Sequence, residues 1–177
     1  MLDATHFLTH LGLSWILANL WDVSRKDRCL IVLAGILPDF EGITLLWSKE
    51  TFLSIHRVVG HSLLSGVALS LVLALRADAR WVTGALALVS FHLHLVLDLV
   101  GTGGLPIQYF WPISRQGWTY PDHWVLASWQ NGLVMIVTLL GVLAIAWRRG
   151  RTPVECVWPR ADRRLVEGAR LRAPTRS

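Results

Sequence analysis

The chain has 177 residues, the length of a single domain, and a formal net charge of +5 at pH 7. Apolar residues make up 53% of it and charged residues only 16%, whereas about a quarter of an ordinary soluble domain is charged. This composition excludes a typical soluble domain and favours an integral membrane protein.

Five hydrophobic segments are expected along the chain. Residues 4–21, 58–75, 81–97 and 125–147 contain no Asp, Glu, Lys or Arg, and the last of these runs has 23 residues, against about 20 needed to span a bilayer core. The hydrophobic segment that contains the uncharged run 81–97 extends to residue 100. Residues 29–47 are also apolar but contain Pro38, Asp39 and Glu41, so a span that is broken or kinked at Pro38 is expected there. We therefore predict an all-α integral membrane helical bundle of four to five hydrophobic segments.

Residues at the segment ends agree with this division. Five tryptophans lie near the boundaries, where amphipathic rings settle at a membrane interface; they are Trp21, Trp47, Trp81, Trp124 and Trp147. The N-terminus lacks a basic region, so no cleavable signal peptide is expected. Cys29 and Cys156 are isolated and form neither a CxxC pair nor a disulfide framework, so no chemistry is predicted for them.

Residues 148–177 differ from the membrane-embedded domain predicted over 1–147. They carry nine arginines against three acidic residues, while the rest of the chain has a net charge of −1. Such a tail can bind nucleic acid or anionic lipid, but the run WRRGR directly after a span is typical of a cytoplasmic anchor. We expect a basic cytoplasmic tail, loosely ordered beyond Pro153, that could contain a short helix, and nucleic acid is not an expected partner.

This anchor orients the other segments. With residues 148–177 inside, the connections 22–28 and 76–80 are also inside, and both are basic, as the positive-inside rule requires. The loop 101–124 is then outside. The same topology places six polar residues at one depth near the outer face, although they are far apart in sequence; they are His6, Asp39, His56, His61, His94 and Asp98.

The sequence FHLHLVLDLV, residues 91–100, places ionisable groups inside an apolar helix. His94 and Asp98 are four residues apart and share one helix face, so they could bind a common metal, or Asp98 could orient the imidazole. A structural hydrogen bond between helices would explain Asp98 equally well. His92 points about 200° away from His94 and is expected to be structural.

The other polar residues leave alternatives open. Asp39 follows a proline and could line a cavity at a helix break, or cap a helix end. His56 and His61 share a site only if His56 precedes the helix and His61 opens it, with Ser62 as a possible cap; otherwise they are interfacial. His6 and His10 could each be a ligand or lie at the interface.

Imidazoles and carboxylates without thiolates suit one or two zinc-like divalent ions, with manganese and iron also open. A divalent ion with an open position promotes hydrolysis. The chain contains no HExxH, GxSxG or Walker A motif.

Four blocks of the sequence, THFL, LPDFE, HRVVGHSLL and HLVLDLVGTGGLPIQYFWP, occur in this order between residues 4 and 112. They resemble the hallmark blocks of the YdjM-like family, bacterial inner-membrane-associated proteins described as metal-dependent hydrolases and as LexA-binding. The resemblance implies a metal site at the six residues of common depth. Where the family has a second Asp and a His, this chain has Glu41 and Gly42. Glu41 could still be a ligand with a longer side chain, but Gly42 cannot, so the resemblance leaves a full two-metal site open. The H-x3-D spacing is also similar to that of all-helical zinc-dependent phospholipase C, which suggests phosphoester chemistry by analogy.

Together these features predict a membrane-embedded metal-dependent hydrolase that acts on a lipid or another phosphoester or ester near the outer leaflet. Arg57 is the expected anion clamp, unless it is an interfacial snorkelling residue, and Glu41 could manage the proton. The alternative is a non-enzymatic transporter or structural protein with a His/Asp metal or proton site. A regulatory protein whose tail contacts DNA is a third possibility.

Overall fold

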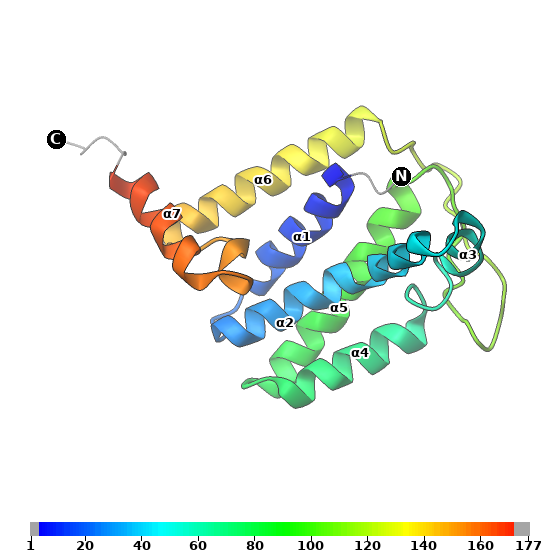
Figure 1. Cartoon of the computed structure of the whole chain (residues 1–177), viewed down its shortest axis with the longest axis horizontal. Helices are drawn as coiled ribbons and strands as arrows, with labels where there is room; N and C mark the ends of the chain where they lie inside the picture. The colour runs from blue at the N-terminus through cyan, green and yellow to red at the C-terminus, as the bar shows by residue number, and fades with distance from the viewer. Residues whose placement is uncertain (1–3, 172–177) are drawn as a thin grey trace.

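The computed structural model describes residues 4–171, and within that range it is built from helices, with one isolated β-bridge between Ile107 and Trp118. In chain order the elements are α1 (Ala4–Ala18), α2 (Arg25–Ile36), the 3-10 helix η1 (Leu37–Leu46), α3 (Lys49–Ile55), α4 (Leu63–Arg76), α5 (Arg80–Gly101), α6 (Trp129–Arg149), the 3-10 helix η2 (Pro153–Cys156) and α7 (Pro159–Leu171). Helix α1 packs against α2 and α6, and α5 packs against α2 and α4 (Figure 1). The all-α prediction is confirmed.

Three helical stretches are long and apolar enough to cross a membrane: Arg25–Leu46, Arg80–Gly101 and Trp129–Arg149. The other two predicted segments are also helical, but α4 has only 14 residues and α1 only 15. At 1.5 Å per residue, α1 is about 22 Å long, less than the roughly 30 Å of a hydrocarbon core. Both short helices begin beside polar residues, since His6 lies in the first turn of α1 and His61 just before α4.

The predicted break at Pro38 is present. Ser24 caps the start of α2 by accepting a hydrogen bond from the Asp27 N–H, and the α-helix ends at Ile36. The 3-10 helix η1 then begins with Pro38 in its first turn, where the missing proline N–H costs no helical hydrogen bond. This change of helix type places Asp39 at the side of the bundle core.

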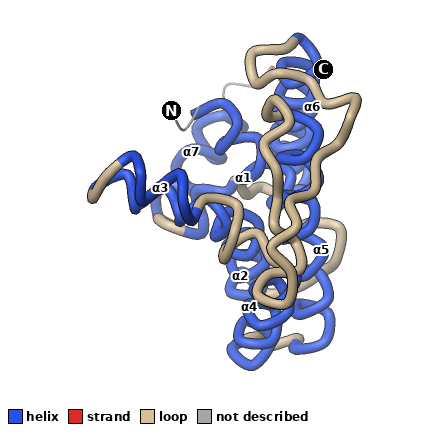
Figure 2. The backbone as a smooth tube through the Cα atoms, turned by 90° about the vertical axis from the view of Figure 1, so that its right-hand side faces the viewer, coloured by secondary structure: helices blue, strands red, loops and turns tan. Residues whose placement is uncertain are grey.

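The segment predicted at 58–75 begins later as a helix. Helix α4 starts at Leu63, and Ser62 is its cap, accepting from the Ser65 N–H. Residues 56–62 form turns in which Arg57 has a φ of +65°, a region that non-glycine residues rarely occupy. The short helix α3, which precedes these turns, was not predicted; it stands to one side of the bundle in Figure 2.

Helices α1, α2 and α5 approach each other closely at Gly35. A Cβ atom on this residue would clash with the side chains of Ser14 on α1 and Ser90 on α5. The apolar core then continues toward the other end of the bundle, where Trp15, Ile31 and other side chains form the largest buried cluster. Close packing at Gly35 brings the three helices together just below the polar residues.

The two ends of the bundle differ in character. One end, on the right in Figure 1, holds the start of α1, the end of α5, η1, α3 and the loop 102–128, and is called the site end below. The other end, called the basic end, holds the start of α2, the turn between α4 and α5, and α7. Its arginines include Arg25, Arg28, Arg76, Arg80, Arg148 and Arg149.

Up to Leu171, where the described part of the chain ends, the tail is folded, contrary to the expectation of loose order beyond Pro153, and it contains the short helix that was considered there. The elements η2 and α7 fold against the basic end, where Arg28 forms a buried ion pair with Glu155 at 2.7 Å. Thr152 also donates from its N–H and its hydroxyl to Asp162. The cysteines were wrongly treated as isolated, because Cys29 on α2 and Cys156 on η2 form a disulfide across 127 residues of sequence. The two cysteines are far apart in sequence, and they meet only because the tail packs against the basic end.

Candidate metal centre

Five of the six predicted metal ligands come together at the site end. They are His6 on α1, Asp39 on η1, His61 before α4, and His94 and Asp98 on α5. A sixth donor, His10 on α1, joins them. Four separate segments therefore contribute side chains to one cluster, which the shared depth of these residues had suggested.

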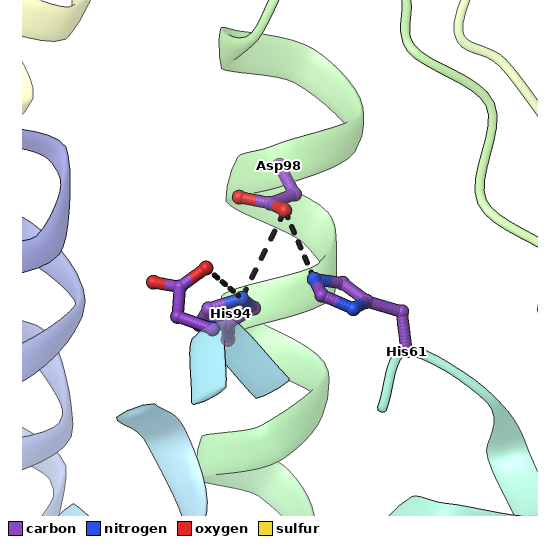
Figure 3. A group of neighbouring side chains, drawn as sticks. His61, His94 and Asp98 are labelled. Atoms are coloured by element: carbon purple, nitrogen blue, oxygen red, sulfur yellow. Dashed lines mark ion pairs between the residues drawn. The ribbon is translucent and has the colours of Figure 1, made fainter. Parts of the chain in front are cut away.

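Asp98 lies at the centre of the cluster. Its Oδ1 is 2.8 Å from His6 Nε2 and 3.3 Å from His10 Nε2. Its Oδ2 is 3.3 Å from His61 Nε2 and 3.8 Å from His94 Nε2. Figure 3 shows His94 one turn away from Asp98 on the same helix, while His61 approaches from a separate segment. The two carboxylate oxygens thus face two different pairs of imidazoles.

These distances suit metal coordination. Ligands about 2.0–2.1 Å from a tetrahedral ion lie about 3.3 Å from one another. One set of donors comprises Asp39, His61, His94 and Asp98, and another comprises His6, His10 and Asp98; within each set the donor atoms all lie within 4.8 Å of one another. Asp39 Oδ1, for example, is 3.6 Å from His94 Nε2. Both sets fit a divalent ion that prefers imidazole and carboxylate ligands.

Several donors are buried without a partner. His61 and His94 have fully buried side chains, yet their Nε2 atoms find no hydrogen bond within residues 4–171, and neither does Asp39 Oδ2. A buried polar atom without a partner costs free energy, typically about 1–3 kcal/mol. The two Nε2 atoms both lie within 4 Å of Asp98 Oδ2, so a cation bound there would satisfy them together.

The other ring nitrogens of two of these histidines are fixed by hydrogen bonds. His94 Nδ1 donates to the Gly35 carbonyl oxygen at 2.9 Å, and His61 Nδ1 donates to Glu41 at 3.1 Å. A metal-binding histidine usually donates its second N–H in this way, which sets the ring orientation and the tautomer. Both rings therefore present an Nε2 lone pair to the centre of the cluster.

Glu41 is held by three donors. Besides His61 Nδ1, its carboxylate accepts hydrogen bonds from the backbone N–H groups of Arg57 and Gly60. These contacts fix the turn before α4 and aim His61. The structure thus places Glu41 behind His61, on the Nδ1 side of the ring, and its role in proton transfer stays a prediction.

Arg57 is buried and lies against the cluster. Its side chain is 2.9 Å from Asp98 Oδ2 and also donates to the Leu105 carbonyl oxygen. Its left-handed backbone conformation is held by hydrogen bonds of its own N–H to Glu41 and of its carbonyl to the Gln108 N–H. Strained residues of this kind gather at functional sites.

His56 and His92 lie outside both donor sets. His56 is 3.8 Å from Glu41, and burial is the largest of the effects that lower the pKa of its ring to about 4. The ring is therefore neutral at neutral pH. His92 donates to the Leu88 carbonyl oxygen and accepts from the Tyr109 hydroxyl. Its expected structural role is confirmed.

A pocket of about 420 Å³ leads to the cluster from the site end. His6, Asp39, Arg57 and Asp98 line its floor, and Phe52, His56 and the loop residues Leu105, Pro106 and Gln108 are among its walls. The predicted outer loop therefore covers the site. The pocket gives a small molecule access to the candidate metal ligands and to a buried arginine.

His10 is the ligand candidate that the family blocks did not single out. It is four residues from His6, the spacing that already linked His94 to Asp98, and its side chain is fully buried. His10 Nε2 lies 2.9 Å from His6 Nε2. The i,i+4 repeat on an apolar helix was the signal that could have identified it.

A family model described as YdjM inner membrane protein matches residues 1–161. The chain belongs to this family. It is thus an inner membrane protein, in agreement with its apolar helices. No curated protein and no solved structure matches it.

Proposed function

We propose that this YdjM family member is a metal-dependent hydrolase of phosphoesters, with two divalent ions, zinc by preference, held at the site end. The observation that supports it is the arrangement around Asp98, whose two oxygens face separate sets of buried donors. A hydrogen-bonded structural cluster would use up its donors and acceptors, whereas this one leaves imidazole nitrogens unpaired among the described residues.

Asp98 belongs to both donor sets and would take part in holding both ions. Asp39, His61 and His94 would complete the ligands of one ion, and His6 and His10 those of the other. The second ion would thus need neither Glu41 nor Gly42, the two positions where the chain departs from the family blocks. This arrangement restores a two-ion site through His10.

Two bound divalent ions supply Lewis-acid activation of water and of a phosphoryl oxygen. In the hydrolysis, the oxygen of a water molecule forms a bond to phosphorus and the bond from phosphorus to the leaving oxygen breaks. One proton of that water passes to the leaving oxygen and the other is released. The guanidinium of Arg57, 2.9 Å from Asp98, is placed to bind the phosphoryl group.

Metal analysis of the purified protein tests the proposal. We expect two equivalents of metal in the wild type and a clear loss in His94→Ala, while His92→Ala, two residues away on the same helix but outside both donor sets, keeps them. Wild-type protein should hydrolyse a soluble phosphodiester, and chelation should abolish that activity. Absence of stoichiometric metal would refute the site, and bound metal without turnover of any phosphoester would favour a transporter or structural protein.

We also propose that the site end faces away from the cytoplasm. The support is the concentration of arginine at the opposite end. A C-terminal fluorescent fusion should then fluoresce, whereas an alkaline phosphatase fusion at the same point should be inactive; the reverse pattern would refute the orientation.

A further inference from the structure

The cluster has a second approach besides the pocket below the loop. A groove of about 180 Å³ runs between α1 and the first turns of α6. His6 and Leu126 line both the groove and the pocket, so the two hollows are adjacent beside the candidate metal ligands. A molecule long enough to fill both would pass directly along His6.

The groove presents mainly apolar surface, although several polar residues line it. The Thr9 hydroxyl donates to the Thr5 carbonyl oxygen. The Asn131 side chain donates to the Gly101 carbonyl oxygen at 2.7 Å and accepts from the Trp124 indole at 2.8 Å. Because these polar groups are already hydrogen-bonded within the protein, a ligand in the groove would contact mainly apolar side chains. They include Leu97, Leu126, Val134 and Met135.

The groove opens toward lipid. Helix α6 is a candidate span of which only 6% of the most apolar window is buried within the molecule. Next to the groove, Leu133, Ile136 and Val137 are each more than half exposed. In a bilayer these side chains contact hydrocarbon, and the groove beside them lies at the depth of lipid chains near one surface.

The pocket adds a buried arginine to the apolar groove, next to the carboxylates of Asp39 and Asp98. Arg57 is 4% exposed, and its Nε has no hydrogen-bond partner in the described part of the chain. A buried guanidinium with a free N–H suits a phosphate oxygen. An apolar groove thus lies beside a pocket that holds a buried arginine, at a candidate hydrolytic centre.

We infer that the substrate is a membrane phospholipid, bound with a hydrocarbon chain in the groove between α1 and α6 and with its phosphate in the pocket beside Arg57. This inference rests on the proposed hydrolase function and adds to it the class of substrate and the path by which it enters. The lipid would move sideways from the bilayer past α6, so its phosphate would reach the cluster without leaving the membrane surface.

Gly132 offers a direct test, because it lines the groove and a Cβ atom on it would meet no other atom within 4 Å. Gly132→Leu should therefore fill the groove without distorting α6, and leucine favours helix more than glycine. Gly168→Leu on α7 is the matched control, since its added Cβ also meets nothing and lies outside the groove. Both variants should keep the metal content of the wild type, which verifies folding of the site.

Two measurements are made on each protein. The first is crosslinking, in vesicles, to phosphatidylglycerol with a photoactivatable acyl chain; the second is hydrolysis of long-chain phosphatidylglycerol against bis(p-nitrophenyl) phosphate, which has no such chain. Gly132→Leu should lower both crosslinking to residues 126–135 and lipid hydrolysis by about tenfold or more. It should leave hydrolysis of the soluble ester nearly unchanged, and Gly168→Leu should alter none of them.

The outcomes separate the two proposals. If the wild type cleaves the soluble ester but Gly132→Leu lowers neither lipid hydrolysis nor crosslinking, the lipid inference is wrong and the hydrolase function stands. If metal-loaded wild type cleaves neither substrate, the hydrolase function is wrong. In that case crosslinking that depends on Gly132 would still support the lipid groove, and its absence would refute it.

Discussion

The two ends of the bundle both bury charged residues, but they treat them in opposite ways. At the basic end, Arg28 is paired with Glu155 and also donates to the Val23 carbonyl oxygen, while the fully buried Asp27 accepts from the backbone N–H groups of Asp78 and Ala79. At the site end, buried imidazole nitrogens and an oxygen of Asp39 lack partners among residues 4–171. Buried polar groups whose hydrogen bonds are all satisfied indicate a structural role, and buried polar groups without partners indicate a bound ligand.

The largest difference between the two ends is expected when one buried aspartate at each end is replaced by asparagine and the metal content and melting temperature are compared. Asp98→Asn keeps the shape of the side chain but removes the charge shared by both donor sets, so we expect loss of all stoichiometric metal and of turnover. Asp27→Asn should keep the metal and lower the melting temperature, because a hydrogen-bonded anion at a helix start is lost. Metal analysis and thermal unfolding in detergent measure both effects. Equal metal contents in the two variants would end the distinction between the ends.

Removal of Glu155 tests the basic end alone. Glu155→Ala leaves Arg28 buried without its ion-pair partner, and loss of one member of a buried pair costs about 3–5 kcal/mol. We expect a marked fall in the free energy of unfolding and loosening of η2 and α7, with metal content unchanged. Limited proteolysis of the tail and thermal unfolding report these effects. If Glu155→Ala lost metal instead, the two ends would be coupled rather than separate.

Glu41→Gln should have a smaller effect and distinguishes two roles. If Glu41 orients His61, the variant weakens metal affinity by about 10–100-fold, and excess metal restores turnover. If Glu41 moves a proton, as the sequence first suggested, metal affinity stays the same and kcat falls without rescue. Titration with a competing chelator and pH profiles of kcat separate these results. Glu50→Gln on the exposed helix α3 is the control.

Local sequence patterns predicted which helices carry the site residues better than they predicted the contacts between those residues. Apolar runs located the helices, Pro38 located the break, and the positive-inside rule placed His6, His61, His94 and Asp98 at one depth. Sequence could not show that Glu41 turns toward the N–H groups of the 57–60 turn, because that turn depends on the left-handed Arg57.

The tail was the least predictable part for the same physical reason. Nine arginines suggested a solvated segment, but burial of Glu155 beside Arg28 and bonding of Cys29 to Cys156 depend on contacts more than 120 residues apart. Such contacts leave no local period in the sequence. His10 was intermediate, since its spacing from His6 was visible but its convergence with Asp98 required the packing of α1 against α5.

The smallest expected effect concerns the exposed ion pair of Lys26 with Asp78. The two side chains are 54% and 57% exposed and 2.9 Å apart, so water and salt screen their attraction. Lys26→Ala should therefore change neither the melting temperature nor the metal content measurably, although it removes a charge from the same end as Glu155→Ala. A large destabilisation would mean that charge balance, rather than burial, stabilises the basic end. An unchanged melting temperature would show that the contrast between the two ends depends on which buried groups have partners, because the surface charges around them would then contribute little.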